Sequence, residues 1–284
     1  MSYASLRAQA EAWLGRSEPV IEICVVDAQG SVPREIGARM LVSADDTAGT
    51  IGGGHLEWVA LERARDMLAQ AGMADAALDY AGDAIVTRYP LGPALGQCCG
   101  GVVTLRTRRL RREDLAQWPA DQPRFALQIY GAGHVGREVA RLLGGVDCDV
   151  QWIDEREQAF PAHAAAPQAP HIRRVCVEPV EAEVDVAPPD ACYLVLTHNH
   201  DLDLRITEAI LRRGDFAYLG LIGSATKRAR FEHRLAERGI AQERIERITC
   251  PIGVPGIEGK DPGVIALAVV AQLLQVGVPA GGAR

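Results

Sequence analysis

Short apolar runs separated by turn-rich segments fill residues 1–108, and such runs are typical of β-strands. One longer segment repeats its apolar residues at three- and four-residue steps, which predicts a helix: HLEWVALERARDMLAQAG. The strand-like runs on either side of it read VIEICVV, ARMLVSA, AIVTRYP and GVVTLRT. Residues 1–108 are therefore predicted to form a small α+β domain.

A different pattern begins at residue 124, where apolar runs alternate with helical segments. These runs read FALQIY, CDVQWID, ACYLVLTH and FAYLGLIG. Strands this apolar are buried on both faces, which is typical of a parallel sheet with crossover helices. Residues 124–284 are predicted to form a Rossmann-like, doubly wound domain, so the fold class is α/β. The charged, proline-containing segment 109–123 is predicted to be the linker.

Composition narrows the class of protein. The chain has 284 residues, 48% of them hydrophobic, and a net charge of −7, which does not favour binding to nucleic acid or to an anionic membrane. Its apolar runs are shorter than the roughly 20 residues that span a bilayer, and its first residues lack the apolar core of a signal peptide. Seven cysteines without CxxC spacing do not suggest disulfides. We expect a cytoplasmic protein that binds small molecules and protein partners.

A glycine fingerprint follows the run FALQIY. It reads Gly131-Ala-Gly133-His134-Val-Gly136, leads into a helical segment, and precedes a strand that ends in Asp154. The first glycine permits a tight turn, the second lets a pyrophosphate approach the backbone, the third allows close helix packing, and the acid stands where a ribose is bound. NAD(P), a phosphate-bearing pterin, or glycines that only close the turn all remain open.

The loop after ACYLVL contains two histidines, His198 and His200, within the sequence THNHDLD. Because loops after parallel strands meet at one edge of the sheet, we expect this loop beside the glycine turn. A binuclear hydrolase motif would need an acid and a histidine where this chain has Leu202 and Asp203, so that match fails. The histidines are predicted to contact a ligand or the loop backbone, with Asn199 or the next acid capping the following helix.

Two further loops end at the same predicted edge. Gly223-Ser224 with Lys227 offers backbone N–H groups and a cation to an anion, or is only a capped helix with a solvated lysine. The loop 251–262 is rich in glycine and ends in Asp261, a good helix cap. It is predicted to be either a lid or a long turn.

In the first domain, a triple glycine centred on Gly53 precedes the predicted helix. Such a segment can cradle an anion with its backbone N–H groups, and Arg34 or Arg39 could supply a guanidinium fork for phosphate or oxo groups. The alternative is that these glycines only make a tight turn.

Paired thiols at Cys98 and Cys99, flanked by glycines, form the most unusual segment, GQCCGG. Neighbouring cysteines point apart and no CxxC partner exists, so a structural zinc site is not expected. One thiolate could contact a soft metal held by other ligands, and molybdenum bound to dithiolene sulfur would suit it. The alternative is two inert, buried thiols.

Taken in order, these motifs resemble the xanthine dehydrogenase accessory protein family, XdhC/CoxI, over nearly the whole chain. The segments that carry the resemblance are GSVPREIGARMLV, GTIGGGHLE, LGQCCGG, IYGAGHVGREVARLL, THNHDLD, YLGLIGSATK and PIGV. The resemblance implies a chaperone rather than a turnover enzyme. Such a protein would bind the molybdenum cofactor (molybdopterin), allow a cysteine desulfurase to install its terminal sulfur, and insert it into xanthine dehydrogenase.

The resemblance also assigns residues. It makes Cys98 and Cys99 candidates for contact with the cofactor, its molybdenum or its sulfur, and it makes the three fingerprint glycines with Asp154 candidates for nucleotide or pterin binding. It implies a homodimer. The sequence departs from the family pattern at Gly263-Val264, where an acid commonly follows the proline. The competing prediction is an NAD(P)-dependent oxidoreductase with His198 or His200 as its base.

Overall fold

The computed structural model describes residues 3–73, 84–92, 100–119, 123–161 and 169–276. The chain divides into two compact units, Tyr3–Asp121 and Gln122–Arg284, each with its own sheet and core. The first sheet is antiparallel and the second parallel, which confirms the predicted fold class. None of the described helices is long and apolar enough to cross a membrane.

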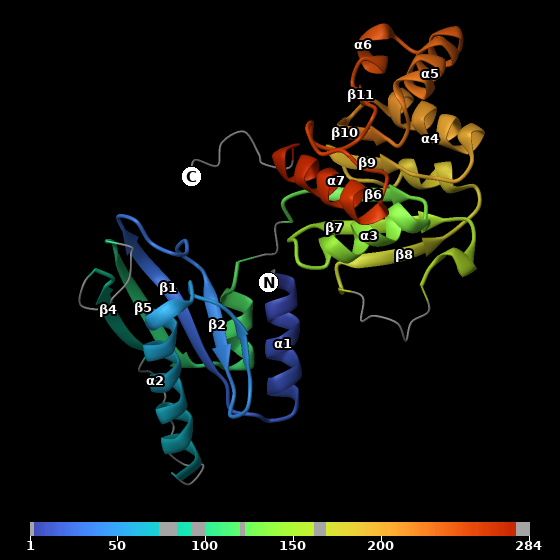
Figure 1. Ribbon diagram of the computed structural model, residues 1–284. Coiled ribbons are helices and arrows are strands. Elements are labelled where there is room, and N and C mark those ends of the chain that lie inside the picture. Colours follow the sequence, from blue (N-terminus) through green and yellow to red (C-terminus); the bar gives the residue numbers. More distant parts are fainter. Residues whose placement is uncertain (1–2, 74–83, 93–99, 120–122, 162–168, 277–284) are drawn as a thin grey trace. The chain divides into compact units, whose positions relative to one another are not determined.

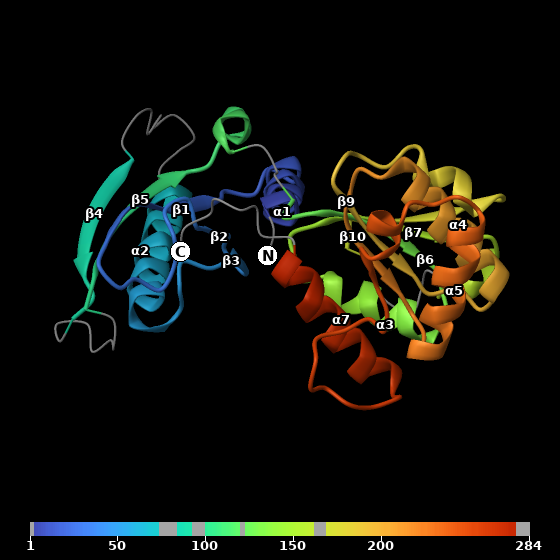
Figure 2. The ribbon, with the colours of Figure 1, turned by 90° about the horizontal axis from the view of Figure 1, so that it is seen from above.

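The first unit is a five-stranded antiparallel sheet in the order β3-β2-β1-β5-β4 (Figures 1 and 2). Helix α2 contributes Leu56 and Ala60 to the core on one face, and helix α1 contributes Leu6 and Trp13 to a separate core cluster. The elements are α1 (Tyr3–Gly15), β1 (Ile21–Gln29), β2 (Arg39–Val42), β3 (Thr47–Gly49), α2 (Gly54–Met73), β4 (Ile85–Pro90), β5 (Val102–Arg109) and the 3₁₀ helix η2 (Arg112–Gln117).

The segment predicted to be a linker, 109–123, contributes to the core of the first unit. Leu110, Leu115 and Trp118 are each less than 5% exposed and belong to the same cluster as α1. Their apolar side chains are spaced among charged residues, so the segment has a polar composition although one side of it is buried. The structure therefore differs from the prediction, because three buried side chains tie this segment to the first sheet.

A buried charge cluster lies within the first sheet. Glu22 on β1 is fully buried, and its two carboxylate oxygens accept from Arg39 on β2 at 3.0 Å and Arg108 on β5 at 2.6 Å. Arg106 lies 3.7 Å from the same carboxylate, and Arg108 also pairs with Asp114. A buried carboxylate is tolerated only when it is paired in this way, so the cluster favours one register of the three adjacent strands.

The second unit is a six-stranded parallel sheet in the order β11-β10-β9-β6-β7-β8. Counted from the first strand of the unit, this order is the usual Rossmann arrangement, and its direction reverses between β6 and β9. Its strands are β6 (Ala126–Tyr130), β7 (Asp149–Asp154), β8 (Ile172–Cys176), β9 (Ala191–Val195), β10 (Phe216–Leu221) and β11 (Ile248–Thr249).

Helices cover both faces of this sheet (Figures 1 and 2). Val139 of α3 and Val269 of α7 pack into the core on one face, and Ile206 of α4 and Phe231 of α5 pack into the core on the other. The helices are α3 (His134–Leu143), α4 (His200–Arg213), α5 (Ala225–Glu237), α6 (Gln242–Ile245) and α7 (Pro262–Val276), with the 3₁₀ helices η3 (Glu157–Ala159) and η4 (Val180–Val184).

Candidate functional site

The glycine turn after β6 is shaped by close approaches of the backbone. Gly131 has a φ of +119°, and a Cβ there would lie 2.5 Å from the carbonyl oxygen of Leu196. A Cβ on Gly136 would lie 2.1 Å from the carbonyl oxygen of Gly131. Both positions therefore require glycine, since any side chain would collide with backbone. Gly133 is different, because a Cβ there would meet no atom within 4 Å.

The amino end of α3 lies open at Gly133. This residue is the N-cap of the helix and makes no side-chain capping bond, and the N–H of Arg137 donates to its carbonyl at 3.0 Å. The N–H groups of residues 134–136 precede that first helical bond and lie at the positive end of the helix dipole. His134 is the first helical residue. This end of the helix therefore offers backbone donors to an anion.

The other long helices of this unit are capped by their own side chains. Asn199 accepts from the second and third N–H groups of α4, which confirms one of the two predicted caps. Ser224 accepts from the N–H of Lys227 in α5 at 3.3 Å, as predicted. Asp261 accepts from Gly263 at the start of α7. Among the described helices of at least ten residues in the second unit, α3 alone lacks a side-chain cap.

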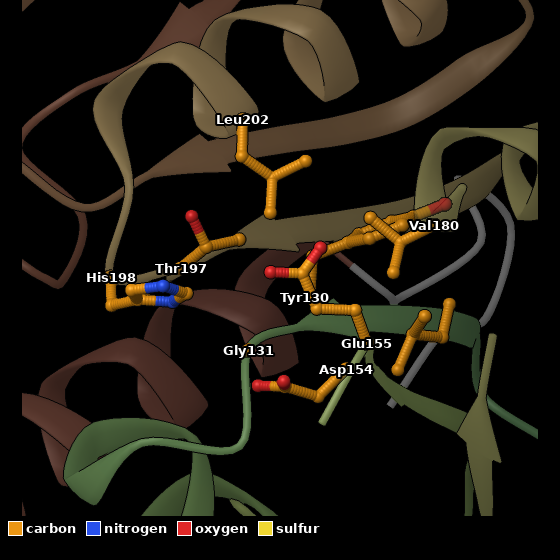
Figure 3. Close-up of a pocket in the computed structure, with 9 residues that line it drawn as sticks. Tyr130, Gly131, Asp154, Glu155, Val180, Thr197, His198 and Leu202 are labelled. Carbon is orange, nitrogen blue, oxygen red and sulfur yellow. The ribbon is translucent and has the colours of Figure 1, made fainter. Parts of the chain in front are cut away.

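A narrow pocket opens over the glycine turn, at the point where the strand order reverses. Gly131, Asp154 and His198 line it, so three residues that the sequence placed at one edge are brought together. Glu155 lines it too, and its carboxylate and the ring of His198 both point into the space over Gly131 (Figure 3). Its remaining lining residues are Tyr130, Ile153, Val180, Thr197 and Leu202.

Asp154 is bound on both carboxylate oxygens by the protein itself. Oδ1 accepts from the N–H and Nε of Arg156 at 3.0 and 2.9 Å, and Oδ2 accepts from the N–H of Ala132 at 2.8 Å and Arg156 Nη2 at 3.0 Å. Burial raises the pKa of Asp154, but these hydrogen bonds outweigh it and hold the pKa below its ordinary value. All of the roughly four acceptor positions of the carboxylate are used. A ribose hydroxyl would therefore have to displace one of them.

A buried ion pair joins helices α4 and α5, which follow β9 and β10. Asp203 is fully buried and accepts from Lys227 Nζ at 2.5 Å and from the hydroxyl and N–H of Thr197 at 2.7 and 3.1 Å. Lys227 Nζ also donates to the carbonyl of Ile222 at 2.8 Å. Lys227, which the sequence offered to an anionic ligand, is thus paired with Asp203 inside the protein, because a buried carboxylate needs a counter-charge. The Thr197 loop that carries His198 is held by this pair.

His200 and Gly223 lie away from the narrow pocket. His200 is exposed at the first turn of α4 and is not among the residues that line the pocket over the glycine turn. Gly223 lines a separate cavity at the end of β10. The sequence thus groups these residues correctly at one sheet edge, but the structure divides that edge into two hollows.

The triple glycine of the first unit does form a cradle of backbone donors, and a side chain of the chain fills it. The carboxylate of Glu57 accepts from the N–H groups of Ile51 and Gly53 at 3.0 and 3.1 Å. Arg34 pairs with the neighbouring glutamate at 3.1 Å and is partly exposed. The anion in this cradle is therefore the carboxylate of Glu57 of the protein itself, four residues after Gly53.

Cys98 and Cys99 lie outside the described residues. The second glycine after them is held in place, because the N–H of Gly101 donates to the carbonyl of Ser31 at 3.1 Å and a Cβ there would lie 2.4 Å from the same oxygen. The cysteine motif therefore ends against the loop that contains Arg34. Within the described ranges, no cluster of three or more histidine, cysteine, aspartate or glutamate side chains is arranged to hold a metal ion.

Two charged residues of the site were not predicted from the sequence. Glu155 lines the pocket and Arg156 fixes Asp154, and both follow directly after the predicted acid. Their position at the carboxyl end of a buried strand was the only available signal, since loop residues there face the ligand edge in parallel sheets.

Comparisons with known proteins agree with this architecture. Residues 127–273 match the XdhC Rossmann domain, and residues 13–81 match the XdhC and CoxI family. An uncharacterized protein, YqeB, from Escherichia coli (strain K12) is 30% identical over 263 aligned residues, and the match covers 89% of this chain and 42% of that protein. This chain therefore spans about two fifths of the length of that curated relative.

A solved structure from Bacillus halodurans, described as a xanthine dehydrogenase, matches with a TM-score of 0.70 and 18% identity over 95% of both chains. At this identity the match shows a shared fold alone. The Rossmann domain match, however, covers just over half of the chain and contains the whole glycine turn and its pocket. The chain belongs to the XdhC and CoxI family.

Proposed function

We propose that this protein is an accessory factor for enzymes of the xanthine dehydrogenase type, and that its cargo is the molybdenum cofactor. It would hold the cofactor while a cysteine desulfurase provides the terminal sulfur, and then pass it to xanthine dehydrogenase. Family membership supports the accessory role. The site supports a ligand that carries a phosphate.

The open amino end of α3 is the observation that carries the proposal. Gly133 leaves free space beside the first N–H groups of the helix, and the other long helices of the unit fill that position with a side chain. Backbone donors at a helix amino end bind phosphate well. The phosphate of molybdopterin would accept from these groups, with Gly131 and Gly136 shaping the turn and His134 beside it.

The molybdenum end of the cargo needs a soft ligand. Thiolates bind soft metals. We therefore assign the molybdenum or sulfur contact to Cys98 or Cys99. Their motif ends at Gly101, against the loop that holds Arg34, whose guanidinium could donate hydrogen bonds to an oxo group.

The alternative function, an NAD(P)-dependent oxidoreductase, uses the same glycine turn. In that case a carboxylate at the end of β7 would bind the ribose. Here Asp154 already accepts four hydrogen bonds from Ala132 and Arg156, so the ribose would compete with the protein. This geometry favours the cofactor carrier.

The test is retention of the molybdenum cofactor by the purified protein after desalting, with molybdenum and pterin measured separately. We expect near-stoichiometric retention by the wild type and less by Cys98→Ala or Cys99→Ala. Cys176→Ala is a matched control, since Cys176 is an exposed thiol of the second unit outside the pocket. No retention by the wild type, together with saturable quenching of NADH fluorescence, would refute the carrier and favour the oxidoreductase.

A further inference from the structure

A second hollow lies at the carboxyl edge of the parallel sheet. It has a volume of about 250 Å³ and is bounded by the loop after β10, the loop after β11 and the first turns of α7. Ile222 and Gly223 form one wall, Val254 and Ile257 come from the second loop, and Val264 and Ala268 come from α7. The proposed carrier function assigns no role to this cavity.

The size of the cavity limits what it can hold. An apolar cavity of about 150 Å³ binds benzene, which has six ring atoms. Two fused six-membered rings have ten ring atoms, so a cavity for them scales to about 250 Å³. A whole dinucleotide needs more room, since pockets even for drug-sized ligands measure about 300–1,000 Å³. The volume found here therefore suits a two-ring system.

The walls of the cavity specify the chemistry of that ring system. Of the described residues that line it, none has a charged side chain, and most are aliphatic or glycine. Such walls bury flat, uncharged surface and leave backbone N–H and C=O groups to bind the ring edge. Gly253 packs against Ala268, and its N–H is already bonded to Gln272 at 2.8 Å, so this part of the wall is fixed.

The cavity and the open end of α3 lie on one edge of one sheet. β6 leads to the glycine turn, β10 leads to the cavity, and β9 lies between them. Two strand spacings of about 4.8 Å separate β6 from β10, or about 10 Å. Helix α7, which forms one wall of the cavity, shares a core cluster with α3. A ligand with a ring system at one end and a phosphate at the other would span this distance.

We propose that this cavity binds a flat, uncharged, fused two-ring heterocycle, which is the ring end of the ligand whose phosphate lies at α3. The link to a phosphate at α3 and the identification of the ring as a pterin both rest on the proposed function; the cavity and the class of ring do not. Val264 and Ile257 then select the ring by shape, and the α3 donors bind the phosphate.

The test compares a variant whose new side chain fills the cavity with a matched variant that carries the same change outside it. Val264→Trp adds a large side chain inside the cavity, and Leu267→Trp adds the same side chain to the same helix at a residue that is 57% exposed and does not line it. Binding of 6-hydroxymethylpterin, which has no phosphate or metal, is measured by its fluorescence. Ile257→Asp, at a rim residue that is 45% exposed, provides a second variant if Val264→Trp does not fold.

We expect free pterin to bind the wild type and Leu267→Trp alike, and at least tenfold more weakly to Val264→Trp and Ile257→Asp. Retention of the molybdenum cofactor by the wild type, with equal retention by the cavity variants, would overturn the inference and leave the proposed function standing. Binding of free pterin that is lost in Val264→Trp, without any retention of the cofactor, would support the cavity and refute the carrier.

Discussion

The open amino end of α3 gives the sharpest prediction, because a charge can be placed there without disturbing the fold. Gly133 has a φ of −71° and a ψ of −172°, which any residue adopts, and a Cβ there meets nothing within 4 Å. Gly133→Asp adds a carboxylate, and Gly133→Asn adds an uncharged side chain of the same shape. Both residues are good helix caps.

The expected effects on binding and on stability have opposite signs. A carboxylate about 4 Å from a bound phosphate costs about 1 kcal/mol in bulk water and about 4 kcal/mol at the effective dielectric of a partly buried site. Since 1.4 kcal/mol is tenfold, the affinity of Gly133→Asp should lie about 5-fold to 1,000-fold below that of Gly133→Asn. Both variants should be more stable than wild type by about 0.5–1 kcal/mol, because they cap α3 and restrict the unfolded chain.

The assay combines cofactor retention after desalting with urea denaturation of each variant. The comparison between aspartate and asparagine isolates the charge, since both replace glycine and both cap the helix. Addition of salt should reduce the difference if the repulsion is partly exposed to solvent. Equal retention by the two variants, with both folded, would show that no phosphate lies at α3.

Three further predictions concern groups around the pocket. Gly136→Ala should lower the free energy of unfolding by about 3 kcal/mol in urea titrations, because its Cβ would lie 2.1 Å from the carbonyl oxygen of Gly131; an unchanged midpoint would contradict this. Lys227→Met should cost about 3–5 kcal/mol by stranding buried Asp203, and the double variant with Asp203→Leu should recover most of it; no recovery would argue against the pair. The pKa of Asp154 is lowered in the folded state, so the ionised side chain stabilises the fold. This contribution to the free energy of unfolding is present above the unfolded pKa of about 3.9 and is lost as pH falls through the lower folded value. The difference in melting temperature between wild type and Asp154→Asn should therefore be large at pH 6 and shrink below about pH 4, whereas a constant difference would refute the assignment.

In the parallel sheet, the buried strands could be read from the sequence and the edge strands could not. The apolar runs that become β6, β7, β9 and β10 are buried on both faces, so their composition is distinctive. The strand β8 lies at the edge of the sheet and carries Arg173 and Arg174, and β11 has only two residues. Neither has the continuous apolar run that marks a central parallel strand.

The site was predictable where local backbone geometry decides it and unpredictable where the position of a side-chain partner does. The requirement for glycine at Gly131 and Gly136 follows from the turn itself. The partners of Lys227 and Gly53 do not, because Asp203 lies 24 residues before the lysine and the Glu57 carboxylate folds back on the glycine loop. Both motifs have the pattern of an anion site, and in both a carboxylate of the chain is the anion.

The charge cluster around Glu22 leads us to expect a particular order of events during synthesis of the chain. Arg108 follows Glu22 by 86 residues, whereas Arg39 follows it by 17. While β5 is still inside the ribosome, burial of Glu22 would leave its carboxylate with one close partner in place of two, which is costly in a core. We therefore expect the emerging first unit to remain open until β5 has left the ribosome and then to close in one cooperative step.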